Sequence, residues 1–218
     1  MHENDRGPGS GVRGPGATDA GSGRVGSCKR ETGETKVRVE VDLDGTGCRV
    51  ATGVGFLDHM LTALATHGGL RLEAEASGDL HVDSHHTVED VGLCLGEALD
   101  TALGERAGIA RFGHAFAPLD EALARAVIDV SGRPFARVEV PRDLLTAFVT
   151  PQFPLTLVGE FWRALASRAR LTLHLDLERA VDPHHAAEAM FKAAALALKA
   201  AAHRVGRGVP STKGTLVE

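Results

Sequence analysis

The sequence predicts an α+β fold that consists of two copies of one unit, each with the order strands, helix, strand and helix. Residues 56–76 and 157–177 share a pattern in which a helix with apolar residues on one face precedes a strand of alternating polarity. A pair of adjacent histidines begins 26 residues after His59 in the first copy and 24 residues after Glu160 in the second. Two such halves favour packed sheets whose helices are segregated to one side.

The first half, residues 28–115, follows an N-terminal segment of different composition. Residues 1–27 consist largely of Gly, Pro and Ser with few apolar residues, which predicts a disordered tail. Order is expected to begin near Val37, where apolar and polar residues alternate as in a half-buried strand. The other elements expected in this half are a short strand after the turn at 44–47, a helix over 54–67, a strand over 70–76 and a helix over 83–104.

The second half, residues 116–205, repeats this succession. The apolar residues of its long helices recur at helical spacing, as they do in the first half, and this predicts one buried face on each helix. Residues 206–218 contain Gly and Pro and are expected to form an exposed C-terminal segment. The elements expected in the second half are strands near 121–130 and 134–140, a helix over 155–168, a strand over 171–177 and a helix over 183–204.

Composition excludes several classes of partner. The net charge is −5 with both signs mixed along the chain, so the basic stripe of a nucleic-acid-binding protein is missing. No apolar run has the length of a membrane-spanning helix. The three cysteines lack metal-ligand spacing and are typical of a reducing compartment. The sequence therefore predicts a cytoplasmic protein without nucleic-acid or membrane partners.

The motif Asp-x-His-His-x-x-Glu occurs twice, each time at the start of a long apolar helix. Residues three and four positions apart share a helix face, so each Glu lies over its own pair of histidines. Imidazole nitrogen and carboxylate oxygen suit a first-row divalent ion such as Zn, Mn, Fe or Ni. One His-His pair is often only part of a polar loop or a helix start, whereas two copies with identical spacing indicate a metal site.

Eight residues are candidate metal ligands, enough to hold two ions with positions left for water or substrate. Six come from the two motifs, and the repeat adds His59 and its counterpart Glu160. Asp83 and Asp182 are expected to cap their helices instead, since Pro183 follows Asp182 at the first helical position. The candidate ligands are His59, His85, His86, Glu89, Glu160, His184, His185 and Glu188.

A second group of residues carries the positive charges and hydroxyl groups that bind phosphate. Lys192 lies four residues after Glu188 on the same helical face, where a simple Glu–Lys surface pair is an equally good interpretation. The other members are Arg111, Arg133, Ser211, Thr212 and Lys213. Together with the metal ligands, this group indicates a dinuclear metal enzyme that acts on a phosphorylated small molecule.

From about Lys29 to the C-terminus, several segments are shared with a known family. They are Gly55-Phe-Leu-Asp-His-Met60, His81-Val-Asp-Ser-His-His-Thr-Val-Glu-Asp-Val91, Ser131-Gly-Arg-Pro134, the second histidine pair with Phe191-Lys192-Ala193, and Pro210-Ser-Thr-Lys-Gly214. The chain resembles imidazoleglycerol-phosphate dehydratase, the histidine-biosynthesis enzyme that converts imidazole glycerol phosphate to imidazole acetol phosphate.

The resemblance implies a hydro-lyase with a ribosomal protein S5 domain 2-like fold and two Mn²⁺ ions per active site, bound by the eight candidate ligands. It also implies a homo-oligomer of 24 subunits with active sites between subunits. Family members with His at position 160 are familiar, and Glu160 is kept as a ligand because carboxylate also suits Mn²⁺. The implied substrate contacts are Glu34, His59 to His67, Arg111, Arg133, Lys192 and the C-terminal residues Ser211, Thr212 and Lys213.

Glu34, His67 and Lys192 are the candidate acid–base groups for the dehydration, and the sequence does not rank them. The ligands alone leave two other functions open. One is a dinuclear metallohydrolase with a metal-bound hydroxide as nucleophile, and the other is a non-catalytic metal-storage or assembly protein. A separate phosphate-binding site would distinguish the dehydratase from the hydrolase, because dehydration requires the imidazole ring at the metals and the phosphate elsewhere. A storage protein would have no need for Glu34 or Lys192.

Overall fold

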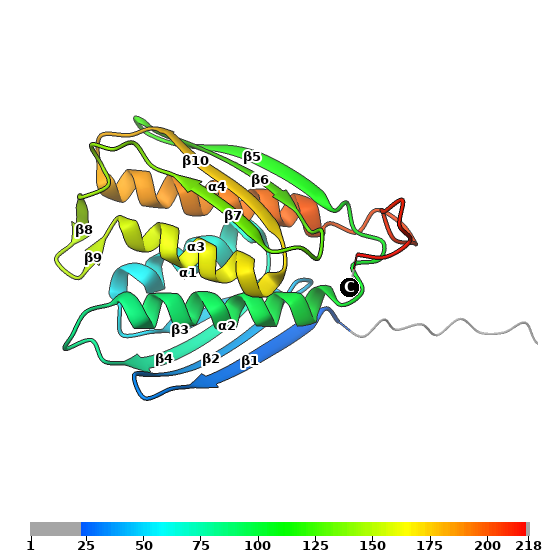
Figure 1. Cartoon of the computed structure of the whole chain (residues 1–218), viewed down its shortest axis with the longest axis horizontal. Coiled ribbons are helices and arrows are strands. Elements are labelled where there is room, and N and C mark those ends of the chain that lie inside the picture. The colour runs from blue at the N-terminus through cyan, green and yellow to red at the C-terminus, as the bar shows by residue number, and fades with distance from the viewer. Residues whose placement is uncertain (1–22, 217–218) are drawn as a thin grey trace, which may run out of the picture.

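The computed structural model describes residues 23–216 of the chain, and both halves contain the same succession of elements (Figure 1). The first half comprises β1 (Val25–Glu31), β2 (Thr35–Asp42), β3 (Cys48–Ala51), α1 (Gly55–Gly68), β4 (Arg71–Gly78) and α2 (His85–Leu103). The second comprises β5 (Phe112–Leu119), β6 (Ala122–Asp129), β7 (Phe135–Glu139), α3 (Thr156–Ala169), β10 (Thr172–Arg179) and α4 (Pro183–Ala202). A small hairpin of β8 (Phe148–Thr150) and β9 (Phe153–Pro154) precedes α3.

The two halves form two four-stranded sheets with the same topology. The strand orders are β1-β2-β4-β3 and β5-β6-β10-β7, and in each sheet the last pair is parallel while the others are antiparallel. Figure 1 shows the sheets on opposite sides of the molecule with the helices between them. The predicted α+β class, the duplication and the segregation of helices to one face of each sheet are confirmed.

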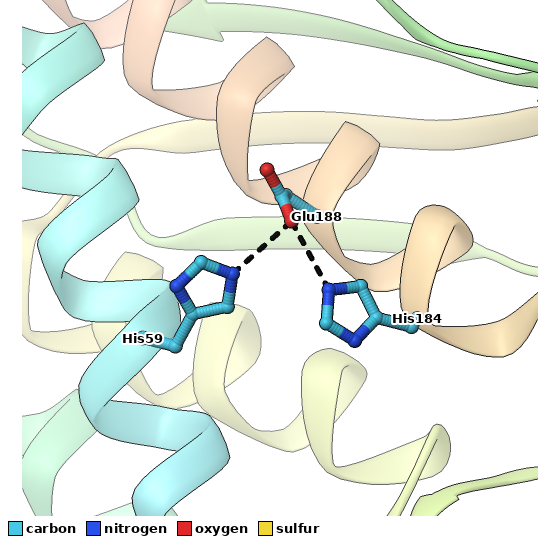
Figure 2. A group of neighbouring side chains, drawn as sticks. All are labelled: His59, His184 and Glu188. Carbon is cyan, nitrogen blue, oxygen red and sulfur yellow. Dashed lines mark hydrogen bonds and ion pairs between the residues drawn. The ribbon is translucent and has the colours of Figure 1, made fainter.

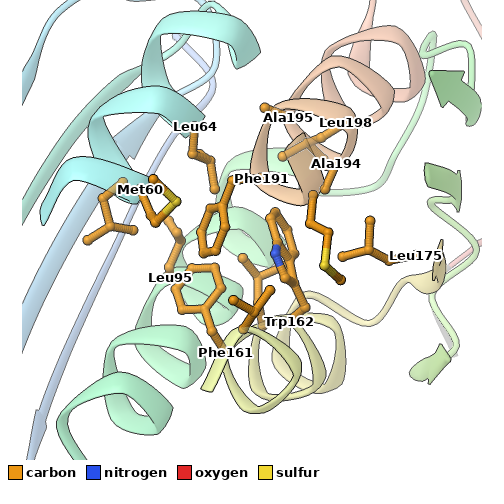
Figure 3. Packing of buried hydrophobic residues seen from close by; sticks show 14 of the residues in the cluster. Met60, Leu64, Leu95, Phe161, Trp162, Leu175, Phe191, Ala194, Ala195 and Leu198 are labelled. Atoms are coloured by element: carbon orange, nitrogen blue, oxygen red, sulfur yellow. The ribbon is translucent and has the colours of Figure 1, made fainter. Parts of the chain in front are cut away.

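The helices bury their apolar faces against each other and against the inner faces of the sheets. α2 packs on β1 and β2, α4 packs on β5 and β6, and the pairs α2–α3 and α1–α4 pack together. The predicted apolar face of α2 is confirmed, since Val88 and Leu99 are fully buried. At the centre, Phe161, Trp162 and Phe191 form an aromatic cluster with ring centroids 5.1 to 5.3 Å apart (Figure 3).

Strands β1 and β5 contradict the expectation from the sequence. Order begins well before Val37, and residues 25–27, which the composition assigned to the N-terminal tail, belong to β1. Residues 112–119, for which the sequence predicted no element, form β5 and pair with β6 along their whole length. The rest of the predicted tail, residues 1–22, lies outside the residues that the structure describes.

The close approach of the long helices explains why these two strands escaped prediction. A Cβ atom at Gly26 would lie 2.0 Å from the Ala98 carbonyl oxygen on α2, and one at Gly113 would lie 2.0 Å from the Ala197 carbonyl oxygen on α4. Only glycine fits at these inward positions, while large residues such as Phe116 face outward. The alternation that marks a half-buried strand is therefore absent from both segments.

The segment after α4 folds back on the loop before β5. The backbone N–H of Val205 donates to the Gly108 carbonyl at 2.8 Å, and the Gly108 N–H donates to the Gly208 carbonyl at 2.6 Å. Leu216 is buried, so the expectation of an exposed C-terminal segment is wrong at this residue. Within residues 23–216, no helix is both long and apolar enough to cross a membrane.

Candidate metal centre

Helices α1 and α4 bring together one cluster of potential ligands from both halves of the chain. His59 lies on α1, while His184 and Glu188 lie one turn apart on α4 (Figure 2). The Nε2 atoms of His59 and His184 lie 3.1 and 3.2 Å from the same carboxylate oxygen of Glu188. The sequence predicted all three residues as ligands, and the structure places them in one group.

The chemistry of this cluster fits a borderline divalent ion. Two imidazole nitrogens and one carboxylate oxygen lie within 4.8 Å of one another, and this donor set suits Mn, Fe or Zn. Burial opposes ionisation of Glu188, but hydrogen bonds from Lys192 and His59 outweigh it and lower the pKa of Glu188 to about 2. The carboxyl is therefore an anion at neutral pH, which is the form that binds metal.

The predicted aspartate cap is confirmed for α4, whereas the N-cap of α2 is Ser84, which makes no side-chain capping hydrogen bond, and Asp83 lies one residue before it. Asp182 is the N-cap of α4, and its side chain accepts hydrogen bonds from the backbone N–H groups of His184 and His185. Asp83, just before α2, accepts from the N–H of His85 at 2.7 Å. Each aspartate thus fixes the backbone that carries a histidine pair, and the imidazole side chains stay available.

A second cluster surrounds the N-terminus of α2. Asp79 Oδ2 lies 3.0 Å from Nδ1 of His86, and Glu34 Oε2 lies 3.7 Å from the same nitrogen. The hydrogen bond to Asp79 is the main reason why the pKa of His86 is raised. One turn along α2, His85 Nε2 and Glu89 Oε2 are 3.5 Å apart. The sequence did not identify Asp79, which lies between the strand predicted over 70–76 and the helix predicted over 83–104.

The second histidine of the α4 pair also has a carboxylate partner. Nδ1 of His185 lies 2.8 Å from Glu121 Oε2, in the turn between β5 and β6, and this hydrogen bond raises the pKa of His185. Glu121 also accepts from the backbone N–H groups of Asp182 and Val181, at 2.9 and 3.2 Å. These bonds, led by the one from Asp182, lower the pKa of Glu121 to about 2.

Lys192 lies beside the first cluster. Its Nζ is 2.7 Å from Glu188 Oε1, four residues earlier on α4, and only 20% of the Lys192 side chain is exposed. The pair expected from the sequence is therefore present, but it is largely buried and adjoins the ligand atoms of Glu188.

All the predicted phosphate-binding residues except Lys192 line one cavity of about 120 Å³. It is formed where the C-terminal segment meets the loop of Ser131, Gly132 and Arg133. Arg111 is held by two hydrogen bonds to the Asp129 carboxylate and donates a third to the carbonyl of Pro210. The lining residues are Arg111, Ser131, Gly132, Arg133, Ser211, Thr212, Lys213, Thr215 and Leu216.

Two predicted residues lie apart from these groups within the described part of the chain. Glu160 is on α3 at the position that corresponds to His59 on α1, and its Oε1 binds Arg163 Nη2 at 2.7 Å. His67 is half-buried in the last turn of α1, and no contact among residues 23–216 joins it to either cluster. Their roles stay predictions.

The metal content of Glu160 variants tests its predicted role. If Glu160 completes a site in the assembled protein, Glu160→Gln should lower the number of ions bound per subunit, because a neutral amide is a poor ligand beside carboxylate. Glu160→His should keep full occupancy, since imidazole can take the same position. Metal analysis of both purified variants makes the comparison, and full occupancy in Glu160→Gln would remove Glu160 from the ligand set.

Comparison with known sequences covers most of the chain. A sequence model of the imidazoleglycerol-phosphate dehydratase family matches residues 52–198. The imidazoleglycerol-phosphate dehydratase of Methylibium petroleiphilum is 51% identical over 197 residues, which cover 88% of this chain and 98% of that protein. The enzyme of the same name from Burkholderia cenocepacia is 50% identical over 197 residues, which cover 88% of this chain and 100% of that protein.

Solved structures show the same similarity. The crystal structure of imidazoleglycerol-phosphate dehydratase from Staphylococcus aureus superposes with a TM-score of 0.74 at 37% identity, covering 83% of this chain and 99% of that one. A structure of the enzyme from Pyrococcus furiosus also gives a TM-score of 0.74 at 37% identity, covering 86% of this chain and 99% of that one. The likeness therefore extends over both halves of the fold.

Proposed function

The chain belongs to the imidazoleglycerol-phosphate dehydratase family, and from this premise we propose how its residues carry out the dehydration. The reaction makes the protein a hydro-lyase of histidine biosynthesis, which converts imidazole glycerol phosphate to imidazole acetol phosphate. The observation that carries the proposal is the convergence of His59, His184 and Glu188 from two halves of the chain on one set of ligand atoms.

Two Mn²⁺ ions are the proposed cofactor. His59, His184 and Glu188 would hold one ion, and the remaining motif residues would supply ligands to both ions. The hydrogen that leaves C2 of the substrate is not next to a carbonyl, so the imidazole ring has to take up the electrons. Bound Mn²⁺ would supply the positive charge that makes the ring a better electron acceptor. The proposed ligands are His59, His85, His86, Glu89, Glu160, His184, His185 and Glu188.

Two of the three candidate acid–base groups, Glu34 and Lys192, lie beside predicted ligands. Overall, one proton leaves C2, the hydroxyl on C3 leaves with a proton as water, and the resulting enol becomes the ketone. A carboxylate such as Glu34 can accept the C2 proton, and an ammonium such as Lys192 can protonate the hydroxyl. Oε2 of Glu34 lies 3.7 Å from Nδ1 of His86, and Nζ of Lys192 lies 2.7 Å from Oε1 of Glu188. Both groups are therefore next to predicted ligands. His67 is retained as a third candidate.

The phosphate of the substrate would occupy the cavity between Arg111, Arg133 and the C-terminal segment. Guanidinium groups bind phosphate through paired charge-assisted hydrogen bonds. Ser211, Thr212 and Lys213 line the same cavity and would add hydroxyl and ammonium donors. A phosphate site separate from the metal ligands is what dehydration requires, and it supports the dehydratase over a hydrolase that attacks the phosphate.

Assembly into 24 subunits, with each active site between subunits, is proposed to complete the ligand set. This is supported by the clusters themselves, because neither group of three residues within the described chain includes His85, Glu89 or His185. The cytoplasm is the proposed compartment, and the free thiols of the three cysteines support it.

Replacing Arg133 tests the phosphate site. Arg133→Met should raise KM about 10- to 100-fold, because hydrogen bonds to charged groups contribute about 1.5–3 kcal/mol and each 1.4 kcal/mol is a factor of ten. Steady-state kinetics with imidazole glycerol phosphate measures the change. Arg207→Met, at an exposed arginine that does not line the cavity, is the matched control and should keep KM within about twofold. An unchanged KM in Arg133→Met would place the phosphate elsewhere.

A further inference from the structure

The duplication places Glu34 and Glu121 at equivalent positions. Each residue ends the turn of a hairpin, directly before β2 in the first half and β6 in the second. The sheet registers agree, since Val39 of β2 pairs with Ala74 of β4 and Ala126 of β6 pairs with Leu175 of β10. Counted from Val39 and Ala126, both glutamates lie five residues earlier in the chain.

The two glutamates face the second histidine of their own half, but only one of them is bonded to it. Glu121 Oε2 lies 2.8 Å from His185 Nδ1 and forms a hydrogen bond. Glu34 Oε2 lies 3.7 Å from His86 Nδ1, which is too long for a hydrogen bond. In the first half the bond to His86 is made by Asp79, whose Oδ2 lies 3.0 Å from Nδ1.

Asp79 belongs with Glu34 and His86 to the second group of potential metal ligands, and its side chain has one hydrogen-bond partner among the described residues. Its side chain is largely buried, its Oδ1 has no hydrogen-bond partner among residues 23–216, and the bond of its Oδ2 is to His86. A buried carboxylate with so few partners costs free energy. Because the fold gains little else from it, the contact with His86 is what explains this residue.

We propose that Asp79 and Glu121 are positioning residues that hold Nδ1 of His86 and His185, and that Asp79 thereby leaves Glu34 available to the substrate. The inference rests on the proposed function. A carboxylate at Nδ1 fixes the tautomer with the proton on Nδ1, orients the ring and directs the Nε2 lone pair to a metal ion. The two equivalent glutamates therefore have different roles. Glu121 orients a predicted metal ligand, whereas Glu34, with 57% of its side chain exposed, is available to transfer a proton.

Titration of Mn²⁺ into chelator-treated protein, with free Mn²⁺ followed by electron paramagnetic resonance, tests the proposal. Asp79→Asn and Glu121→Gln should each weaken Mn²⁺ binding about 10- to 100-fold, the usual effect of removing such a partner. Glu34→Gln should bind Mn²⁺ within about twofold of the wild type while its kcat falls. Asp79→Glu, which keeps the carboxylate, should recover part of the lost affinity.

Asp143 provides a control away from both clusters. It is exposed in the segment between β7 and β8 and belongs to neither group of potential ligands within the described residues. Asp143→Asn should therefore fold and keep the wild-type Mn²⁺ affinity. Melting temperatures of the metal-free variants separate a loss of Mn²⁺ affinity from a loss of stability, because Glu121 also binds two backbone N–H groups.

Three outcomes would overturn the inference. Unchanged Mn²⁺ affinity in both Asp79→Asn and Glu121→Gln would show that neither carboxylate supports a ligand. An equal loss of Mn²⁺ affinity in Glu34→Gln would show that Glu34 also supports metal binding and has no separate role in proton transfer. Complete loss of one ion in Asp79→Asn would make Asp79 a ligand itself. Failure of the proposed function is distinguishable, because the wild-type protein would then bind no Mn²⁺ or form no product.

Discussion

His184→Ala should lower kcat/KM by about three orders of magnitude and reduce the number of bound ions. His184 and His59 share one carboxylate oxygen of Glu188, so the substitution removes one of the three potential ligands in this cluster. A bound metal ion contributes several kcal/mol of charge stabilisation in the transition state. At 1.36 kcal/mol for each factor of ten, this corresponds to about a thousandfold in rate.

The control for this variant is His203→Ala, at an exposed histidine that follows α4 and lies outside both clusters. It should keep the wild-type metal content and kcat/KM. Metal analysis and steady-state kinetics on both variants make the comparison. If His184→Ala retained full metal content and activity, the cluster in Figure 2 would not be the metal centre.

Trp162→Ala should have the largest effect on stability, a loss of about 3–5 kcal/mol in the free energy of unfolding. Trp162 is 1% exposed and contacts Phe161 and Phe191 at the centre of the four helices (Figure 3). Its removal should leave a cavity beside Phe161 and Phe191, because the surrounding structure relaxes only partly. Urea denaturation of the metal-free protein, at one fixed protein concentration, measures the loss.

Trp162→Phe is the matched variant. The indole Nε1 is buried without a hydrogen-bond partner among the described residues, and an unsatisfied buried donor is itself destabilising. Phenylalanine keeps most of the aromatic contact and removes this donor, so it should lose less than half as much stability as Trp162→Ala. A loss below about 1 kcal/mol in Trp162→Ala would show that the aromatic cluster does not hold the layers together.

The sequence predicted the parts of this structure that depend on regular spacing. The histidine pairs recur with one internal spacing, and the apolar residues of α2 recur every three or four positions, so both could be found from local pattern. The correspondence of His59 with Glu160 followed from aligning two helices of similar pattern. In the structure these residues do lie at equivalent places on α1 and α3.

Features that depend on contacts between distant segments could not be found this way. The inward positions of β1 and β5 carry Gly26 and Gly113 because a helix backbone passes over them, and glycine leaves no apolar signal in the sequence. The contact between Asp79 and His86 depends on how the end of β4 packs beside the start of α2, so the local sequence does not indicate it. A carboxylate that supports a metal ligand has no fixed spacing from it, so no motif marks it.

The sequence also could not place the ligands relative to one another. His59 and Glu188 are 129 positions apart and meet only because α1 packs on α4. The structure shows this meeting, whereas Glu160 binds Arg163 within its own helix. The proposed completion of the ligand set between subunits would depend on surface contacts in the assembled protein, which the pattern of a single chain does not contain.

The most direct test of the central claim, metal-dependent dehydration by these histidine clusters, is to follow imidazole acetol phosphate formation by the chelated protein before and after Mn²⁺ is restored. We expect no product in the chelated state and recovery of turnover with Mn²⁺, because the charge that activates the imidazole ring is supplied only by the bound ions. Full turnover in the chelated state, or no product from the intact protein after Mn²⁺ is restored, would contradict this account.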